Sequence, residues 1–432
     1  LIVDFQQAIE YLYGLNQFGI KLGLENMQRL IARLPELQSL PPLVHVAGTN
    51  GKGSVSACLA EILRHSGLRI GLYSSPHLHC FTERIRIDGQ PISKDDAASL
   101  VSQLQQVSRG IPLTFFEMTT AMALLAFCRQ RVDCAVIETG MGGRLYATNI
   151  IEPCLTLITP ISLDHQQHLG TSLVAIAGEK AGIIKPRIPL VIGRQQPEVE
   201  KVLLDTAQRH DVPVLVAGRD YHWSGSRTSL TLSVGDDLLS SPGPALPGEH
   251  QLDNFAQATA AGLLLRNQGM PVSAAAIRAA AATVSWPGRL EWWGEGRRIL
   301  LDAAHNAAGA SCLATYLRQQ GVGRVRLVFG LSGGRSPAEV FGPLCQMTDE
   351  LFAVPVAAAD TVSPDQIQSW AASQGIASHA FDSAEEGFAA ALAGAGAATP
   401  VVVAGSIYLV ATVRSALQTG WPESFLVKTE NG

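Results

Sequence analysis

The residues of this chain that are best suited to a chemical function form one short stretch, Gly48-Thr49-Asn50-Gly51-Lys52-Gly53-Ser54. Glycines let a backbone approach an anion closely, and the N–H groups at a helix start point toward it. Lys52 is suited to neutralising the outer phosphates of a nucleotide, and the Ser54 hydroxyl to holding magnesium. Because Gly53 separates these two residues, the strict phosphate-loop spacing is not met, and a plain glycine turn is the alternative. The lysine and the flanking segments favour nucleotide binding.

The segments around this stretch have the pattern of a strand, a loop and a helix. The apolar run 43–47 is typical of a buried parallel strand, and apolar residues recur at helical spacing over 54–66. Further strand and helix patterns alternate downstream, which predicts a doubly wound parallel sheet of the α/β class. The expected strands are 43–47, 69–74, 132–138, 154–158, 189–192 and 212–216. The expected helices are 54–66, 94–108, 117–130, 172–180 and 197–209, and 4–40 is also largely helical.

Three polar residues follow expected strands at the edge where the phosphate loop lies. Ser75 follows the second strand, Glu138 closes the third and His165 follows the fourth. Ligands of doubly wound sheets bind beyond the carboxyl ends of the strands, and a carboxylate there suits a magnesium ion that bridges phosphate oxygens. Singly, a turn serine, a capping carboxylate and a surface histidine are equally good interpretations. Together, the three favour a functional site.

Two other groups have strong structural alternatives. Lys180 ends an expected helix, and from composition alone a favourable charge at a helix C-terminus is its better interpretation. Asp302 and His305 follow an expected strand, with Arg289 upstream, and could face a nucleotide. A helix N-cap with a surface histidine is the alternative for this pair.

A second strand–helix series follows a pause in the pattern near Ser285-Trp286-Pro287-Gly288. Because domain boundaries fall where such patterns stop, we expect two domains, residues 1–287 and 288–432. The strands expected in the second series are 298–302, 325–330, 351–354 and 400–404. Its expected helices are 308–319, 337–347, 364–374, 383–394 and 407–418.

Composition narrows the class of protein. The chain has 432 residues, 47% of them hydrophobic and 16% charged, and a formal net charge of −5. This balance is typical of a globular protein and argues against a general nucleic-acid surface. No apolar run has the length of a membrane span, and the opening residues lack a signal-peptide pattern. Seven scattered cysteines without a C-x-x-C pair indicate neither a disulfide framework nor a zinc site, so we expect a reducing cytoplasm.

Taken in order, these motifs resemble the folylpolyglutamate synthase/dihydrofolate synthase family of the Mur ligase superfamily. The resemblance covers nearly the whole chain and rests on Gly48 to Ser54, Ser74-Ser-Pro-His77, Glu83-Arg-Ile85, Thr114-Phe-Phe-Glu117, Glu138-Thr-Gly-Met-Gly-Gly-Arg144, Leu163-Asp-His165 with Leu169-Gly-Thr171, Glu179-Lys-Ala-Gly-Ile183, His250-Gln251 with Asn254, Trp286-Pro-Gly-Arg-Leu290 and Asp302-Ala-Ala-His-Asn306. It implies a Mur-ligase-like fold, with an N-terminal phosphate-loop domain and a smaller Rossmann-like C-terminal domain.

The resemblance also implies an activity and its cofactors. It implies an ATP-dependent amide ligase that phosphorylates a folate-type carboxylate and joins L-glutamate to the acyl phosphate. Tetrahydrofolate polyglutamylation is expected, together with conversion of dihydropteroate to dihydrofolate. The implied cofactors are ATP and Mg²⁺ at two sites, with a monovalent cation as a further candidate. A monomer without a nucleic-acid or membrane partner is expected.

Individual roles follow from the same resemblance. The positions implied for ATP are Gly48, Thr49, Asn50, Gly51, Lys52, Gly53, Ser54, Asn254, Arg289 and Asp302. The metal positions are Ser54, Ser75, Glu138 and His165. Catalytic roles are implied for Lys180, His165, Asp302 and His305, with Lys180 carbamylated and supporting the second metal, which reverses the interpretation from composition. The folate or pterin positions are Arg84, Thr114, Phe116, Tyr146 and Ala147.

One departure concerns the acceptor. After Arg144 the family usually reads Leu-Asp-Ala-Thr-Asn, whereas this chain has Tyr146 in the acidic position. A carboxylate accepts hydrogen bonds from the N–H groups of a pterin, and a tyrosine offers only a hydroxyl, so dihydropteroate recognition is the step most affected. Two alternatives stay open: another Mur-type amino-acid ligase with a different acceptor, and a nucleotide-binding homologue without ligase activity.

Overall fold

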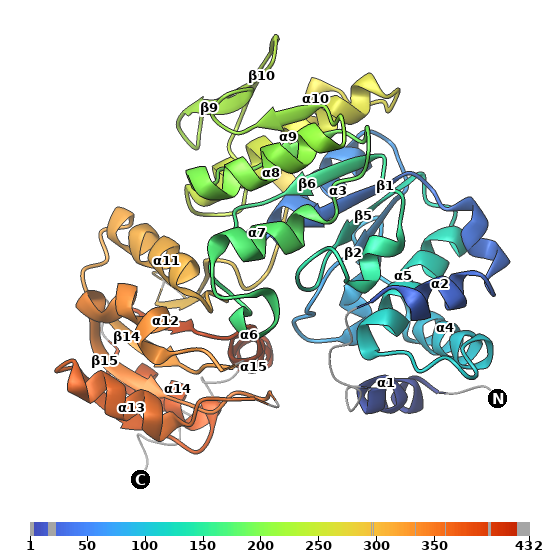
Figure 1. The fold of residues 1–432 in the computed structure, drawn as a ribbon. Coiled ribbons are helices and arrows are strands. Elements are labelled where there is room, and N and C mark those ends of the chain that lie inside the picture. The colour runs from blue at the N-terminus through green and yellow to red at the C-terminus, as the bar shows by residue number, and fades with distance from the viewer. Residues whose placement is uncertain are drawn as a thin grey trace. The chain divides into compact units, whose positions relative to one another are not determined.

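The structure is a computed structural model that describes residues 4–15, 23–294, 296, 298–332, 334–358, 360–395 and 399–420. The chain forms two compact units (Figure 1). The first comprises Leu1–Ala245 and Gln251–Ser285, and the second comprises Leu246–His250 and Trp286–Gly432. The chain passes into the second unit between Ser285 and Trp286, and the short segment Leu246–His250 also belongs to that unit.

An eight-stranded sheet forms the centre of the first unit, in the order β4-β3-β2-β5-β1-β6-β7-β8. Six of its strands form a parallel array, as the alternating pattern predicted, and at one edge β3 pairs antiparallel with both β2 and β4. The strands are β1 (Leu43–Ala47), β2 (Ile70–Tyr73), β3 (Ile85–Ile87), β4 (Gln90–Pro91), β5 (Cys134–Glu138), β6 (Leu155–Ile158), β7 (Leu190–Ile192) and β8 (Val214–Val216). Because β1 lies between β5 and β6, its carboxyl end is central in the sheet.

Helices pack against this sheet. Leu43 and Ile137 pack with residues of α4 and α5 in one hydrophobic cluster, whereas Ile158 and Ile192 pack with α7 and α8 in another. The helices are α1 (Phe5–Gly14), α2 (Glu25–Ile31), α3 (Lys52–His65), α4 (Lys94–Val107), α5 (Phe115–Arg129), α6 (Gln166–Leu169), α7 (Leu173–Ala181), α8 (Pro197–Arg209), α9 (His250–Asn267) and α10 (Ala274–Thr283). Short 3₁₀ helices are η2 (Pro35–Ser39), η3 (Phe81–Arg84) and η4 (Ala147–Ile150). Of the predicted helical region 4–40, residues 16–22 lie outside the described residues.

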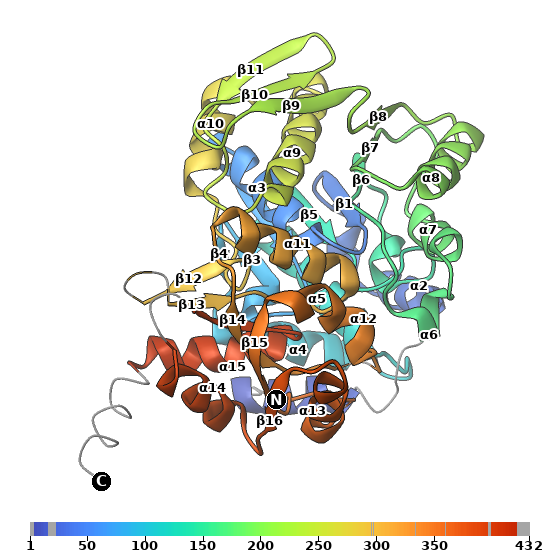
Figure 2. The same ribbon diagram turned by 90° about the vertical axis from the view of Figure 1, so that its left-hand side faces the viewer.

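A small antiparallel sheet lies beside α10 in the first unit, as both views show (Figure 1, Figure 2). Its strands are β9 (Tyr221–Gly225), β10 (Leu230–Val234) and β11 (Asp237–Ser241), in the order β11-β10-β9. The run 229–234 predicts one outlying strand, which is present as β10, whereas no strand was expected at β9 and β11, which have few buried apolar positions. Among the described residues, no helix has both the length and the apolar character needed to cross a membrane.

The second unit contains a six-stranded sheet in the order β12-β13-β17-β14-β15-β16, in which only β12 is antiparallel. Its strands are β12 (Glu291–Trp293), β13 (Ile299–Leu301), β14 (Val325–Phe329), β15 (Thr348–Ala353), β16 (Ala377–Ala380) and β17 (Val401–Ala404). Its helices are α11 (Ala307–Gln319), α12 (Pro337–Phe341), η5 (Gly342–Met347), α13 (Pro364–Ser373), α14 (Ala384–Ala393) and α15 (Ile407–Gln418). The single helix predicted over 337–347 is wrong in its second half, where the chain turns 3₁₀ at Gly342 and Pro343. Proline lacks the N–H that an α-helix requires.

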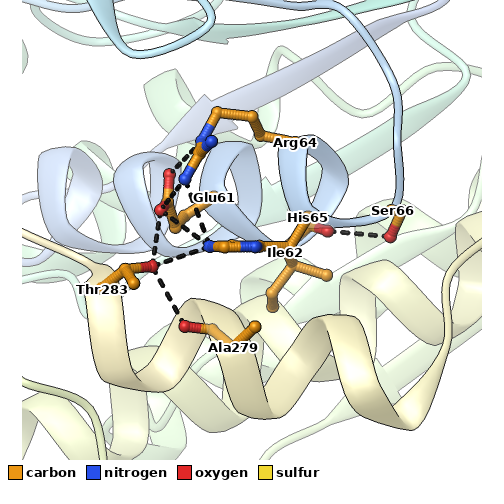
Figure 3. A network of polar contacts seen from close by, with 7 residues as sticks. All are labelled: Glu61, Ile62, Arg64, His65, Ser66, Ala279 and Thr283. Atoms are coloured by element: carbon orange, nitrogen blue, oxygen red, sulfur yellow. Dashed lines mark hydrogen bonds and ion pairs between the residues drawn. The ribbon is translucent and has the colours of Figure 1, made fainter.

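A polar network joins the end of α3, the helix that follows the phosphate loop, to the end of α10 (Figure 3). The Thr283 hydroxyl lies 2.6 Å from Glu61 Oε1 and 2.8 Å from His65 Nε2, and Arg64 donates two hydrogen bonds to the Glu61 carboxylate. Burial raises the pKa of Glu61, but the bonds from Arg64 and Thr283 outweigh it and bring the pKa below its ordinary value. The network therefore ties the last residues of the first unit to the phosphate-loop helix.

Thr283→Val is expected to destabilise the first unit by about 1 kcal/mol, because the Glu61 carboxylate loses one hydrogen bond in a partly buried position. The urea midpoint measures this effect, and Thr283→Ser, which keeps the hydroxyl, is the matched control. Since the pKa of Glu61 is lower in the folded state, the network stabilises the protein above pH 4.5 and is lost as the pH falls through the folded-state pKa. A difference between wild type and Thr283→Val that stays constant down to pH 3 would contradict this account.

Candidate active site

The phosphate loop connects the carboxyl end of β1 to the first turn of α3. Gly48 and Gly51 have φ angles of +147° and +84°, which L side chains rarely adopt. A Cβ at Gly48 would collide with the Thr159 side chain, and one at Gly51 would lie 2.6 Å from Asn254 Oδ1. The backbone N–H groups of Thr49 and Asn50 both donate to the Pro160 carbonyl, at 3.0 and 3.1 Å. The loop is thereby held against the segment that follows β6.

Side chains from two other elements also touch this loop. The Thr49 hydroxyl donates to the Ser162 carbonyl at 3.1 Å, and Asn50 Nδ2 donates to the Ser162 hydroxyl at 3.0 Å. Asn254, on α9, packs beside Gly51 and donates to Gln251 Oε1 at 2.9 Å. Within the loop, Lys52 Nζ donates to the Thr49 carbonyl at 3.2 Å. Asn254, a position predicted for ATP, therefore lies next to the phosphate loop, which was predicted to bind the same ligand.

Lys180 reaches the same loop from the last turn of α7. Its side chain is 3% exposed, and Nζ donates to the Gly48 carbonyl at 2.7 Å. Burial and the nearby charge of Lys52 lower the pKa of Lys180 to about 7, against the opposing effect of Asp164. An ordinary surface charge at a helix C-terminus does not account for this burial. At neutral pH, a substantial fraction of this amine is therefore uncharged and nucleophilic.

Glu138 and Ser75 lie at the carboxyl ends of neighbouring strands, β5 and β2. Glu138 is 4% exposed, and the Ser75 backbone N–H lies 3.4 Å from Glu138 Oε2. Glu138 also pairs in register with Val46 of β1, so its carboxylate is beside the strand that leads into the phosphate loop. Oxygen donors of this kind suit Mg²⁺, which binds few protein ligands and keeps its waters and phosphate oxygens. Among the described residues there is no group of three or more His, Cys, Asp or Glu able to hold a metal.

His165 precedes α6 with a φ angle of +51°, and its side chain is 43% exposed. Its Nε2 lies 3.8 Å from Asp164 Oδ2, and its backbone N–H donates to Asp164 Oδ1 at 2.9 Å. Asp164 is buried and raises the pKa of Lys180. No role was predicted for Asp164 from the sequence, although a carboxylate next to a candidate metal histidine was a usable signal.

The positions predicted for the acceptor fall into two groups. Arg84, Phe116 and Tyr146 gather in one aromatic cluster, where the Phe116 and Tyr146 rings are 5.2 Å apart. The Thr114 hydroxyl instead accepts from the Glu117 N–H as the N-cap of α5, and Ala147 opens η4 directly after Tyr146. Burial raises the pKa of Tyr146 far above its usual range, so its hydroxyl stays protonated.

The loop between Ser75 and Arg84 is folded around one carboxylate that the sequence left without a role. Glu83 accepts the backbone N–H groups of Leu78, His79 and Cys80 at 2.9–3.0 Å. Because a carboxylate that accepts several N–H groups fixes a loop firmly, Glu83 is a positioning residue for the segment that carries Ser75. The motif Glu83-Arg-Ile was visible in the sequence, but not the contacts of its glutamate.

In the second unit, Asp302 and His305 follow β13. Asp302 accepts the backbone N–H groups of Leu290 and Ala304, both at 2.9 Å, and His305 Nδ1 lies 2.8 Å from the Ala303 carbonyl. The alternative of Asp302 as a helix N-cap is wrong, because Asn306 caps α11. Asp302 instead holds the turn that follows Arg289.

A shallow, open hollow lies in the first unit, beside Asn254. Among the residues that line the hollow, Trp223 and Arg194 both donate to Asp253 Oδ1 at 2.9 Å. Gln257, which also lines it, donates to the Ile158 carbonyl of β6 and the Val191 carbonyl of β7. The hollow therefore opens at the carboxyl ends of the strands, next to the phosphate loop, where ligands of doubly wound sheets bind.

Comparison with known proteins identifies the class to which this fold and loop belong. The Mur ligase middle domain matches residues 46–262, and the Mur ligase glutamate ligase domain matches 288–407. The fold is therefore that of a Mur-type ligase, as predicted, and such ligases depend on ATP.

Individual similar proteins define the family within that class. Dihydrofolate synthase/folylpolyglutamate synthase of Escherichia coli is 33% identical over 95% of this chain and 94% of its own length. The structure of E. coli FolC in complex with DHPP and ADP superposes with a TM-score of 0.87, at 33% identity, over 95% of this chain and 98% of that one. A bifunctional folylpolyglutamate synthase/dihydrofolate synthase with Mn, AMPPNP and L-glutamate bound matches with a TM-score of 0.86, at 32% identity, over 97% and 100%. The chain belongs to the folylpolyglutamate synthase/dihydrofolate synthase family of ATP-dependent ligases.

Proposed function

We propose that this protein joins L-glutamate to a folate-type carboxylate at the expense of ATP, through an acyl phosphate. The observation that carries the proposal is the convergence of Lys52, Lys180, Glu138 and Ser75 around the carboxyl ends of β1, β5 and β2. Relatives whose structures hold ADP, or AMPPNP with Mn and L-glutamate, support the same chemistry. We therefore assign ATP and a divalent metal as the cofactors.

The reaction needs a carboxylate to become a good acylating agent. A carboxylate oxygen of the acceptor attacks the γ-phosphorus of ATP, and ADP leaves. The neutral amine of glutamate then attacks the acyl carbon, and phosphate departs from the tetrahedral intermediate. Lys52 and the N–H groups of the phosphate loop hold the phosphates and neutralise charge that develops on them. Catalysis is therefore mainly positioning and electrostatic stabilisation.

The residues around the loop are suited to divalent metal. We assign Ser54, Ser75 and Glu138 to one Mg²⁺ and His165 to a second. The metal, when bound, would neutralise phosphate oxygens during transfer. Arg289, Asp302 and His305 of the second unit are assigned to nucleotide and glutamate, as the sequence predicted. We further propose that the protein uses a monovalent cation, is a monomer and is located in the cytoplasm.

We assign Lys180 a carbamate. The uncharged amine attacks CO₂, an N–C bond forms, and the proton released passes to water. The product is an anion next to the Gly48 carbonyl, where it replaces the cation that the nearby Lys52 disfavours. An anionic oxygen at this place would support the metal assigned to His165.

Phosphate release by the purified protein tests the proposal. The assay contains ATP, Mg²⁺ and L-glutamate with dihydropteroate or tetrahydrofolate as the acceptor, and omits glutamate as a control. Glutamate-dependent release with both acceptors is expected. Release with tetrahydrofolate alone would restrict the protein to polyglutamylation, and ATP binding without release with either acceptor would overturn the ligase assignment.

Tyr146→Asp is expected to raise kcat/KM for dihydropteroate about tenfold relative to tetrahydrofolate, because a carboxylate can accept N–H groups of a pterin that a phenol cannot. The phosphate-release assay with each acceptor measures the ratio. Tyr146→Phe, which removes the hydroxyl and keeps the ring, is the control for loss of the hydroxyl alone. An equal change with the two acceptors would show that Tyr146 does not set this preference.

A further inference from the structure

The turn that leads into β12, Gly288-Arg289-Leu290, has a strained backbone. Gly288 and Leu290 have φ angles of +75° and +49°. Glycine adopts such an angle freely, whereas for a leucine it is unfavourable, because the Cβ comes too close to the backbone. Leu290 is 1% exposed and packs into the hydrophobic cluster of the second unit, so burial of its side chain offsets the strain. Strain that the surroundings maintain in this way is typical of functional sites.

Two carboxylates hold the N–H groups on the two sides of Arg289. Asp302 Oδ2 accepts the Leu290 N–H at 2.9 Å. Glu291 Oε2 accepts the Gly288 N–H at 2.7 Å. Gly288 and Leu290 are both buried, whereas Arg289 between them stays partly exposed. The turn therefore presents Arg289 from a backbone that is fixed on both sides.

Glu291 is itself held by two further side chains. Arg414, on α15, has its Nε 3.0 Å from both carboxylate oxygens, and Trp293 donates its indole N–H to Oε1 at 3.0 Å. The Arg414 guanidinium carbon also lies 5.7 Å from the centre of the Trp293 ring. The side chains of Arg414 and Glu291 are 14% and 21% exposed, and water screens a partly buried ion pair less than an exposed one. The ion pair thus fixes the carboxylate that holds the turn.

The pairing of β12 already secures this edge of the sheet. β12 has three residues and is held there by its antiparallel backbone pairing with β13. A strained turn and a partly buried ion pair are unfavourable additions, because both ions lose water and Leu290 keeps its left-handed angle. What these additions achieve is a single backbone conformation at Arg289.

We propose that the ion pair of Glu291 and Arg414 positions Arg289 for binding of the nucleotide. This inference rests on the proposed function, in which Arg289 is assigned to ATP. Both members of the pair act through the Gly288 backbone, so they are positioning residues. Without the pair, the turn samples other conformations, and Arg289 must be ordered when the nucleotide binds, which lowers affinity. α15 thereby contributes to nucleotide binding, although Arg414 lies 123 positions beyond Glu291 in the chain.

A double-mutant cycle tests this coupling. Calorimetry measures binding of AMPPNP with Mg²⁺ to wild type, Glu291→Ala, Arg289→Ala and the variant with both changes. Glu291→Ala is expected to weaken binding about tenfold in wild type, and by less than about twofold once Arg289 is alanine, because the two changes remove one interaction. Equal losses in the two backgrounds would overturn the proposal, and so would an Arg289→Ala variant that binds AMPPNP as tightly as wild type.

Steady-state kinetics separate positioning from general damage to the fold. If Arg289 holds the nucleotide equally before and during the reaction, Glu291→Ala should raise KM for ATP about tenfold and leave kcat nearly unchanged. Glu291→Gln keeps an oxygen that accepts the Gly288 N–H and is expected to restore most of the affinity. Arg414→Met, which preserves most of the side-chain volume, should give a smaller loss of the same kind. A fall in kcat with an unaltered KM for ATP would show that the pair does not act through nucleotide binding.

The ion pair of Arg326 and Glu350 is a matched control in the same unit. Their side chains, on β14 and β15, are 15% and 24% exposed and lie 2.6 Å apart. Glu350→Ala is expected to lower the melting temperature as Glu291→Ala does, but to leave AMPPNP affinity unchanged. Equally weakened AMPPNP binding in Glu350→Ala would refute the proposal, since loss of stability alone would then explain the effect. Glutamate-dependent phosphate release by wild type tests the proposed function separately, because the binding cycle needs no acceptor.

Discussion

Lys180→Ala is expected to lower the turnover number by at least about a thousandfold, because it removes the only side chain proposed to carry the carbamate at the phosphate loop. Nucleotide affinity should change little, since the loop is held independently by the Pro160 carbonyl and by Ser162. The phosphate-release assay gives the first quantity, and calorimetry with ADP gives the second.

Two further variants isolate the role of Lys180. Lys180→Met preserves most of the buried volume and is expected to be as inactive as the alanine variant. Lys185→Ala is the matched control, because Lys185 also donates to a backbone carbonyl, that of Asn149, and lies outside the proposed site. A short carboxylic acid supplied to Lys180→Ala should restore part of the activity by filling the place of the carbamate. Near-normal turnover without any addition would refute the assigned role.

The carbamate also gives the wild type a specific dependence on pH and CO₂. Since the pKa of Lys180 is lowered to about 7, its amine is mostly protonated below that pH and cannot attack CO₂. Activity in a CO₂-depleted buffer is expected to recover on addition of bicarbonate, and to recover faster as the pH rises through 7. ¹³C NMR with labelled bicarbonate would detect the carbamate directly. Activity indifferent to CO₂ at every pH would contradict the prediction.

Glu138→Gln is expected to reduce kcat by at least about a hundredfold and to raise the Mg²⁺ concentration needed for half-maximal rate, because an amide cannot supply the anionic oxygen of a carboxylate. Glutamine keeps the shape of the side chain beside the Ser75 N–H, so the fold should be preserved. Phosphate release as a function of Mg²⁺ measures both effects.

The matched control for this change is Glu152→Gln, which removes an exposed carboxylate shortly before β6. It should leave the Mg²⁺ dependence unchanged. Binding of ADP without metal is expected to be unaffected, or slightly stronger, in Glu138→Gln, because a negative charge near the phosphates is lost. An unaltered Mg²⁺ requirement in Glu138→Gln would remove this glutamate from the metal site.

Several features of the protein were predictable because they depend on residues close together in the chain. The apolar run 43–47 and the glycines that follow it dictate a strand, a tight loop and a helix, and these elements are present as β1, the phosphate loop and α3. The alternation of such segments predicted the parallel sheet, and the ordered motifs predicted the family, which the comparisons confirmed. Short strands without a fully buried residue, such as β12 and β16, had no comparable signal.

The sequence by itself determined the class of fold, the phosphate loop and the kind of reaction, because periodicity and motif spacing are properties of neighbouring residues. Only the tertiary structure decided the environment of the reactive groups. Lys180 meets the Gly48 carbonyl across 132 positions of the chain, and its lowered pKa arises from burial beside Lys52. Arg84 likewise lies beside aromatic rings because α5 packs against β2 and β3, which brings Phe115 and Phe116 close to its guanidinium, about thirty residues earlier in the chain. Burial and charge pairing depend on such long-range packing, so the sequence could name these residues but not their environment.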